Sequence, residues 1–258
     1  MSVFRSPGAA RRASRPPREP LRSRRLGRRL VQLYLGLALY GASAGLLVRA
    51  GLGLDPWDVL HQGIARHTGL TIGTVAIILS AAVLLLWVPI RQRPGLGTVS
   101  NALLVGLAMD GTIWLVPEVR ALAVRIPLMV AAIVLNGVAT GLYISARFGP
   151  GPRDGLMTGL HRVTGRSIRL VRTGIEITVL ASGVLLGGSA GVGTVLYALA
   201  IGPLSQVFLR VFTVPQPRPG TAAAPEPAPE TRPGSGPEPA PETGPEPGAE
   251  GARAILRP

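Results

Sequence analysis

Four acidic side chains stand in parts of the chain that are otherwise apolar, and they are its best candidates for chemistry. Asp58 and Asp154 belong to the motifs DPWD and GPRD, whereas Asp110 and Glu176 lie within long apolar runs. A carboxylate at membrane depth is costly unless it is paired, protonated or hydrated, so it commonly marks a substrate, ion or proton pathway. A nearby arginine such as Arg172 offers a purely structural pairing instead. We expect these carboxylates to bind a substrate or to couple its movement to protons.

Each motif also has the composition of a helix start. Asp55 is a good N-cap, Pro56 fits the first helical position, and Asp58 lies where an acid complements the helix dipole. Pro152 and Asp154 repeat the arrangement. On one interpretation the two segments are capped helices on surface loops. On the other they are re-entrant half-helices whose N-termini approach the membrane midplane from opposite sides, ready to bind an anion.

The motif occurs twice because the chain contains an internal duplication. An offset of 96 residues aligns Asp58 with Asp154, and it aligns GLGTV at 95–99 with GVGTV at 191–195. Each copy contains three apolar runs, and an odd number makes the second copy enter the membrane from the opposite side. The pattern therefore predicts two inverted three-helix repeats, each with a short re-entrant or interfacial helix.

Glycines and prolines of the motif keep the same register. Gly53 aligns with Gly149, and Pro56 aligns with Pro152. A residue without a Cβ lets the backbone approach a neighbour closely. We expect these positions to border the substrate site in both copies.

Six apolar runs are long enough to cross a bilayer core of about 30 Å as helices of roughly 20 residues. The runs are 30–50, 72–90, 98–117, 123–146, 171–189 and 193–214. Placing both termini in the cytoplasm puts most loop arginines on the inner side, as the positive-inside rule requires. The inner arginines are Arg91, Arg93, Arg147, Arg153, Arg162, Arg166, Arg169 and Arg210, and the outer ones are Arg49, Arg66, Arg120 and Arg125.

The two ends of the chain differ in composition from its membrane part. Residues 1–29 carry ten arginines. They indicate a disordered basic arm at the anionic cytoplasmic surface rather than a nucleic-acid-binding arm, because no aromatic residues alternate with the arginines. Residues 215–258 repeat PEPAPET within a Pro/Glu/Ala/Gly tract, which predicts a disordered cytoplasmic tail. The membrane repeats then occupy 30–118 and 119–214.

Several kinds of chemistry lack the residues they need. The chain has no cysteine and no lysine, which removes thiol nucleophiles, Cys-ligated metals and Lys Schiff bases. GASAG at 41–45 has the shape of a serine-nucleophile turn, but its copy GVATG keeps only the Gly-xxx-Gly spacing of close helix packing. We expect no enzyme activity, no cofactor and no metal site. The histidines lack metal-ligand spacing and are expected at the surface: His61, His67 and His161.

The motifs DPWDVLH, TIGTV, RPGLGTVSN, GPGPRDGLMTG and GVGTVLYAL resemble those of the YczE-like branch of bacterial integral membrane proteins, which is related in style to the YitT group. The resemblance covers roughly residues 28–212. It implies a protein of the bacterial inner membrane whose activity is poorly defined and is often assumed to be transport, and it supplies no substrate or site residues.

Together these patterns predict an all-α integral membrane protein of the bacterial plasma membrane, with six transmembrane helices and both termini cytoplasmic. We expect a secondary transporter or exporter of a small molecule, working by alternating access between the repeats with possible proton coupling. The alternative is a membrane accessory or scaffold protein that assists a biosynthetic or envelope process. The expected partners are the lipid bilayer and an unknown small molecule, with no nucleic acid, and a homodimer stays open.

Overall fold

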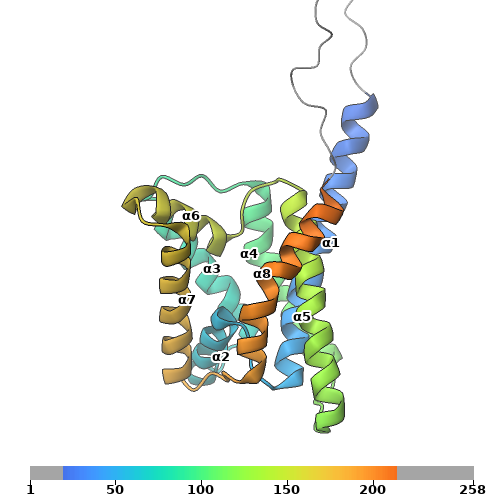
Figure 1. Ribbon diagram of the computed structural model, residues 1–258, viewed down its shortest axis with the longest axis vertical. Helices are drawn as coiled ribbons and strands as arrows, with labels where there is room; N and C mark the ends of the chain where they lie inside the picture. Colours follow the sequence, from blue (N-terminus) through green and yellow to red (C-terminus); the bar gives the residue numbers. More distant parts are fainter. Residues whose placement is uncertain (1–19, 214–258) are drawn as a thin grey trace, which may run out of the picture. The chain divides into compact units, whose positions relative to one another are not determined.

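In the computed structural model, residues 20–213 are described, with side chains from residue 26, and every regular element in that range is a helix (Figure 1). The helices are α1 (Pro20–Ala50), α2 (Pro56–Thr68), α3 (Ile72–Leu86), α4 (Leu96–Leu115), α5 (Leu122–Ser145), α6 (Pro152–Thr164), α7 (Ile168–Leu185) and α8 (Val192–Phe212). The all-helical prediction is confirmed for this part of the chain.

Short helices α2 and α6 begin and end as their sequences predict. The Asp55 side chain accepts hydrogen bonds from the backbone N–H groups of Trp57 and Asp58, and Pro56 opens the helix. In α6, Gly151 takes the N-cap position without a side chain to bond. Both helices stop at a glycine in the left-handed conformation, with φ of 73° at Gly69 and 67° at Gly165.

The duplication extends to the backbone. Helices α2, α3 and α4 begin 96 residues before α6, α7 and α8. Every described residue with positive φ also has its equivalent at this offset, and the pairs are Gly51/Arg147, Gly53/Gly149, Gly69/Gly165 and Arg91/Gly187. Turn geometry has therefore been kept even where glycine has been replaced by arginine.

Glycines of the two aligned Gly-xxx-Gly segments lie against neighbouring helices. A Cβ at Gly41 would collide with the Val105 carbonyl on α4, and one at Gly141 would collide with Phe208 on α8. Ser43 lies between these glycines in the sequence and is buried, donating to the Tyr40 carbonyl. The packing interpretation of GASAG is confirmed, because close approach of helices requires the missing side chains.

Contacts between the two halves are reciprocal. The Gly193 N–H donates to the Leu52 carbonyl at 2.8 Å, and the equivalent Gly97 N–H donates to the Phe148 carbonyl at 2.9 Å. In the same way α2 packs on α7, and α6 packs on α3. Each half thus completes the other through equivalent segments.

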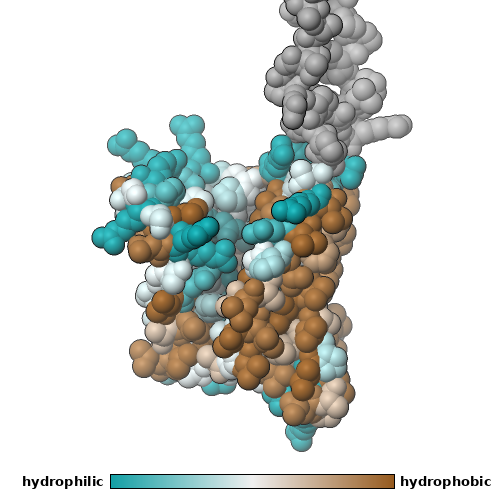
Figure 2. Space-filling model, viewed as in Figure 1, coloured by the Kyte–Doolittle hydropathy of each residue, from teal (hydrophilic) through white to brown (hydrophobic). Residues whose placement is uncertain are grey.

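Wide apolar surfaces cover the helices α5 and α8 and the lower part of α7, as Figure 2 shows. Within the described residues four helices are long and apolar enough to cross a membrane, and a fifth span arises if α2 and α3, bent by 112°, count together. The four are α1, α4, α5 and α8. The predicted spans at 72–90 and 171–189 do not qualify alone, because α3 has 15 residues and α7 carries charged side chains such as Arg172 and Glu176.

One boundary in the sequence analysis was wrong. Helix α1 begins at Pro20, so residues 20–29, which were assigned to a disordered arm, form its first turns. The rest of the predicted basic arm and the Pro-rich tail lie outside the described residues.

Candidate functional site

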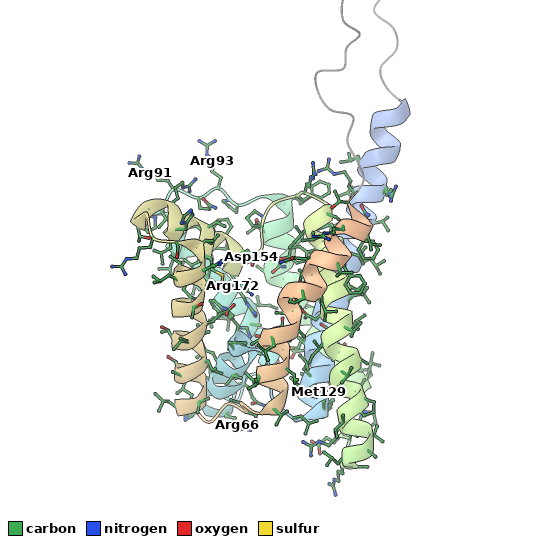
Figure 3. The ribbon with its side chains drawn as sticks, viewed as in Figure 1. Arg66, Arg91, Arg93, Met129, Asp154 and Arg172 are labelled. Carbon is green, nitrogen blue, oxygen red and sulfur yellow. The ribbon has the colours of Figure 1, made fainter. Side chains whose placement is uncertain are left out.

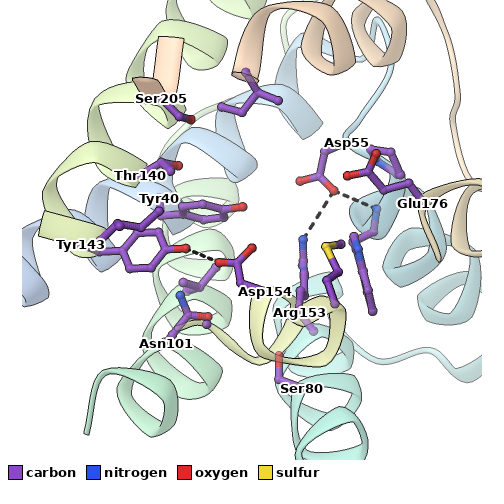
Figure 4. Close-up of a pocket in the computed structure, with 18 of the residues that line it drawn as sticks. Tyr40, Asp55, Ser80, Asn101, Thr140, Tyr143, Arg153, Asp154, Glu176 and Ser205 are labelled. Atoms are coloured by element: carbon purple, nitrogen blue, oxygen red, sulfur yellow. Dashed lines mark hydrogen bonds and ion pairs between the residues drawn. The ribbon is translucent and has the colours of Figure 1, made fainter. Parts of the chain in front are cut away.

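A cavity of about 310 Å³ lies at the centre of the helices, and all eight of them contribute to its wall (Figure 4). This volume is in the range of small-molecule sites in proteins. Its lining is mixed, with carboxylates, arginines, hydroxyl groups and aromatic rings between apolar side chains. The cavity is therefore suited to a small molecule that carries charge.

The wall of this cavity is closed on one side and open on the other. Helix α3 packs along α4, with Gly73 against Gly106 so closely that a methyl group on either would overlap the carbonyl oxygen of the other. The equivalent helices α7 and α8 lack such packing, and Gly202, the equivalent of Gly106, has no atom of the described residues within 4 Å of where its Cβ would lie. Figure 2 shows hydrophilic side chains in the recess between α7 and α8.

A buried charged cluster forms part of the wall. Asp55 and Asp58 from α2 are 2% and 1% exposed, and Arg153 from α6 reaches both, at 3.6 Å from each Oδ1. His61 Nδ1 lies 2.9 Å from the Asp58 Oδ1. The arginine also lies over the ring of Trp57. One guanidinium group from the second half is thus shared by two carboxylates from the first.

Two carboxylate oxygens of this cluster could still accept a hydrogen bond. Oδ2 of Asp55 and Oδ2 of Asp58 are buried and have no hydrogen-bond partner among the described residues. Buried polar atoms are nearly always paired, so two such atoms on adjacent carboxylates need an explanation. A proton on one of the carboxyl groups, or a ligand at Asp55, which lines the cavity, would supply the missing partner.

Two further predicted residues, Asp154 and Glu176, line the cavity directly. Asp154 accepts a 2.6 Å hydrogen bond from the Tyr143 hydroxyl group. Glu176 accepts one of 2.8 Å from Arg172 Nε, which is the structural pairing that the sequence had offered as an alternative. Asp154 and Arg172 lie nearer to the end of the molecule that bears Arg91 and Arg93 than to the opposite end with Arg66 (Figure 3).

Asp110 belongs to the closed wall rather than to the cavity. Its Oδ2 accepts a hydrogen bond from the Thr71 hydroxyl group at 2.5 Å, and its Oδ1 accepts one from the Gly73 N–H at 2.8 Å. These bonds tie the end of α4 to the start of α3. Asp110 is thus placed to hold α3 and α4 together.

Of the remaining predicted residues, one lines the cavity and the others make contacts within the fold. Pro56 lines the cavity, whereas the Pro152 carbonyl accepts a hydrogen bond from the Trp87 indole N–H. Gly53 and Gly149, with φ of 121° and 115°, approach the starts of α8 and α4. The close backbone approach predicted for these glycines is therefore made to the other half of the chain, and they do not line the cavity.

Two of the sequence-based assignments need correction. His61 was expected at the surface but is buried against Asp58. Arg153 was counted as a loop arginine, yet its side chain is only 20% exposed and enters the cavity wall. The repeat alignment held a signal for Arg153, because it replaces the Trp57 of the first copy. No comparable signal marked the tyrosines of the wall, Tyr40, Tyr143 and Tyr197.

No metal centre is indicated in the described part of the chain. It contains no group of three or more His, Cys, Asp or Glu side chains placed to hold a metal ion.

The buried serine of GASAG, Ser43, accepts a 2.7 Å hydrogen bond from the Asn136 amide, which in turn accepts one from Tyr197. This polar network links α1, α5 and α8.

Comparison with known proteins places the chain in a family. A family model described as a family of unknown function, DUF6198, matches residues 27–210. The membrane protein YczE of Bacillus subtilis, named as uncharacterized, is 33% identical over 185 residues, which is 71% of this chain and 84% of that protein. The chain belongs to the YczE-like family of membrane proteins.

Two other bacterial proteins are similar to the chain over most of their length. An uncharacterized protein of Haemophilus influenzae is 42% identical over 179 residues, covering 69% of this chain and 82% of that protein. YyaS of Bacillus subtilis, also named as uncharacterized, is 26% identical over 185 residues, covering 69% of this chain and 92% of its own length. No solved structure matches the chain.

Proposed function

We propose that this protein is a secondary transporter of a small molecule in the bacterial plasma membrane, and not an enzyme. In this proposal the chain crosses the membrane six times as two inverted repeats, and α2 and α6 enter the membrane as half-helices joined to α3 and α7. The helix starts at a constant offset and the reciprocal contacts between the halves support two repeats related by a two-fold axis, and three spans in each repeat would make them inverted. The arginine-rich end with Arg91 and Arg93 faces the cytoplasm, together with both termini.

The asymmetry of the cavity wall carries the proposal. Inverted repeats make transport possible because each can adopt the conformation of the other, which moves the opening of a shared site across the membrane. Here equivalent helix pairs differ: α3 and α4 are packed together, whereas α7 and α8 are apart. Exchanging the two arrangements would close the cavity between α7 and α8 and open it between α3 and α4.

Asp110 would act as the latch of the closed side. It ties α4 to Thr71 and Gly73, and its equivalent in the second half is Gln206, which faces the cavity instead. In the exchanged form Gln206 would bond to Ser167, the equivalent of Thr71. The amide oxygen of Gln206 can accept the same hydrogen bond, and because it is neutral the bond is weaker than one to a carboxylate.

In this proposal the buried charged cluster couples transport to protons. Asp55 and Asp58 each keep an oxygen without a partner in the part of the chain that the structure describes, while a single arginine faces both. A proton taken up by either carboxylate would weaken its ion pair with Arg153, which belongs to the opposite repeat. Protonation would thereby change the energy of the contact between repeats, as coupling requires.

Two pairs of cysteines test the alternation in a chain that has none of its own. Thr71→Cys with Asp110→Cys reports the contact between α3 and α4, and Ser167→Cys with Gln206→Cys reports the equivalent contact between α7 and α8. In membrane vesicles a short bifunctional thiol reagent should join either pair. Joining one pair should prevent the joining of the other within the same molecule.

The contrary result is equally clear. If the first pair joins completely and the second never joins, the halves do not exchange conformations. A role as a membrane accessory or scaffold protein would then replace transport as the proposed function. A chain in which both pairs join at once would also exclude alternation.

A further inference from the structure

Three kinds of charged or aromatic group meet at the cavity, and their balance suggests what it binds. Carboxylates of Asp55, Asp154 and Glu176 line it, with Asp58 directly behind Arg153. The guanidinium groups are those of Arg153 and Arg172. Four carboxylates against two guanidinium groups leave a formal charge of −2. A cavity of this kind concentrates cations.

Both arginines already face carboxylates, so an anion at either one would compete with a negative charge that is part of the protein. Arg153 faces Asp55 and Asp58, and Arg172 is bonded to Glu176. The N-terminus of α2 is likewise occupied, because Asp55 accepts the N–H groups of its first turn. An anionic ligand would meet a carboxylate already present at each of these places.

Asp154 is the acid that the arginines leave unpaired. No arginine among the described side chains lies within ion-pair distance of it, and its one hydrogen bond comes from Tyr143. Its side chain is exposed within the cavity wall, so a ligand can reach the carboxylate. Figure 4 shows Asp154 on the same side of the cavity as Tyr40 and Tyr143, with Asp55 and Glu176 on the other side.

Aromatic rings line the cavity that holds this carboxylate. Tyr40 and Tyr143 pack edge to face, with ring centroids 6.1 Å apart, and Tyr197 and Trp57 also line the cavity. Faces of aromatic rings attract cations, and most strongly those that carry organic substituents and give up their hydration easily. An unpaired carboxylate among aromatic rings is the arrangement expected for a substituted ammonium ion.

Resting on the proposed transport function, we infer that the substrate is a small organic cation, with Asp154 as its anchor and the tyrosines around it as the walls of the site. The unpartnered Oδ2 of Asp55, buried at the same cavity, is the second acceptor. The volume of about 310 Å³ limits the substrate to a small amine or quaternary ammonium ion.

The charge preference of the cavity can be measured without knowing the substrate. Ser205 lines the cavity on α8, and Ser205→Cys gives the full chain a single thiol. Its rate of modification is compared for two methanethiosulfonates, one bearing a trimethylammonium group and the other a sulfonate. Each rate is divided by that of a small free thiol with the same reagent. We expect the cationic reagent to be preferred by about tenfold or more.

Variants assign the preference to the proposed anchor. Asp154→Asn should lower the ratio several-fold, and Glu176→Gln should lower it through a second cavity acid. Glu118→Gln serves as the matched control, because Glu118 lies in the α4–α5 loop with a side chain 75% exposed, outside the cavity. Choline should slow the modification of Ser205→Cys, whereas its neutral isostere 3,3-dimethylbutan-1-ol should not.

A preference for the sulfonate reagent, or an equal rate for both, would overturn the assignment of a cation. That failure is distinct from a failure of transport. If the two cysteine pairs exchange while the cavity prefers the sulfonate, the protein alternates but carries another class of substrate. If the cavity prefers the ammonium reagent while the pairs do not exchange, the cation site stands and transport falls.

Discussion

Trp57 and Arg153 occupy equivalent positions in the two halves of the chain, and they lie against each other, with the guanidinium carbon 5.0 Å from the ring centroid. Equivalent positions meet only where a two-fold relation would place its axis. Two arginines there would repel each other, and two tryptophans would leave Asp55 and Asp58 without a cation. The difference between the halves at this one position therefore makes the buried cluster possible.

Removal of the central arginine should destabilise the fold. Arg153→Gln leaves Asp55 and Asp58 buried without their cation, and breaking a buried pair in this way typically costs about 3–5 kcal/mol. Thermal unfolding of the purified protein in detergent measures the loss. The double variant with Asp58→Asn should recover part of it, because one of the uncompensated charges is gone. If the double variant is less stable than Arg153→Gln alone, the pairing has been misassigned.

Equivalent glycines should respond differently to the same change. Gly106→Ala places a methyl group on the Gly73 carbonyl and should cost about 1–3 kcal/mol through overpacking. Gly202→Ala meets open space and should be neutral, or stabilising by up to about 1 kcal/mol from helix propensity. The unfolding temperatures of the two variants, measured side by side, test the asymmetry. Equal losses would mean that both helix pairs are packed.

Loss of the Asp110 latch should favour opening between α3 and α4. Asp110→Ala removes the acceptor for Thr71 and Gly73. A hydrogen bond to a charged group contributes about 1.5–3 kcal/mol, so the open form should gain roughly tenfold or more. The measurement is the reaction rate of Ser80→Cys in the cavity with an impermeant reagent supplied from the end that bears Arg66. An unchanged rate there would show that Asp110 holds no gate.

The polar network of α1, α5 and α8 should contribute to stability rather than to chemistry. Asn136 is fully buried and bonds to both Ser43 and Tyr197. Asn136→Ala removes the acceptor of the Tyr197 hydroxyl group and the donor to Ser43, and the buried donor left without a partner should cost about 1–3 kcal/mol. Ser43→Ala should cost less and leave the modification rate of Ser205→Cys unchanged. A large change in that rate with an unchanged unfolding temperature would give Ser43 a role at the site.

Local signals in the sequence determined the helices and the repeat. Pro56 and Pro152 open helices because proline fits the first helical position, and Gly69 and Gly165 close them because glycine adopts positive φ at no steric cost. These preferences depend on a few adjacent residues, so they can be read along the chain. Matching prolines and glycines lie 96 residues apart in the sequence, and the observed helix starts have the same offset.

Only the tertiary structure decided what the acidic residues do. Asp58 and Asp154 stand at equivalent positions, yet Asp58 is buried between His61 and Arg153, whereas Asp154 is exposed to the cavity beside Tyr143. Asp110 and Glu176 differ in the same way, because Asp110 holds two helices together whereas Glu176 lines the cavity. Apolar runs in the sequence show only that a carboxylate has apolar neighbours along the chain. Its partners come from other helices, and packing between distant segments chooses them.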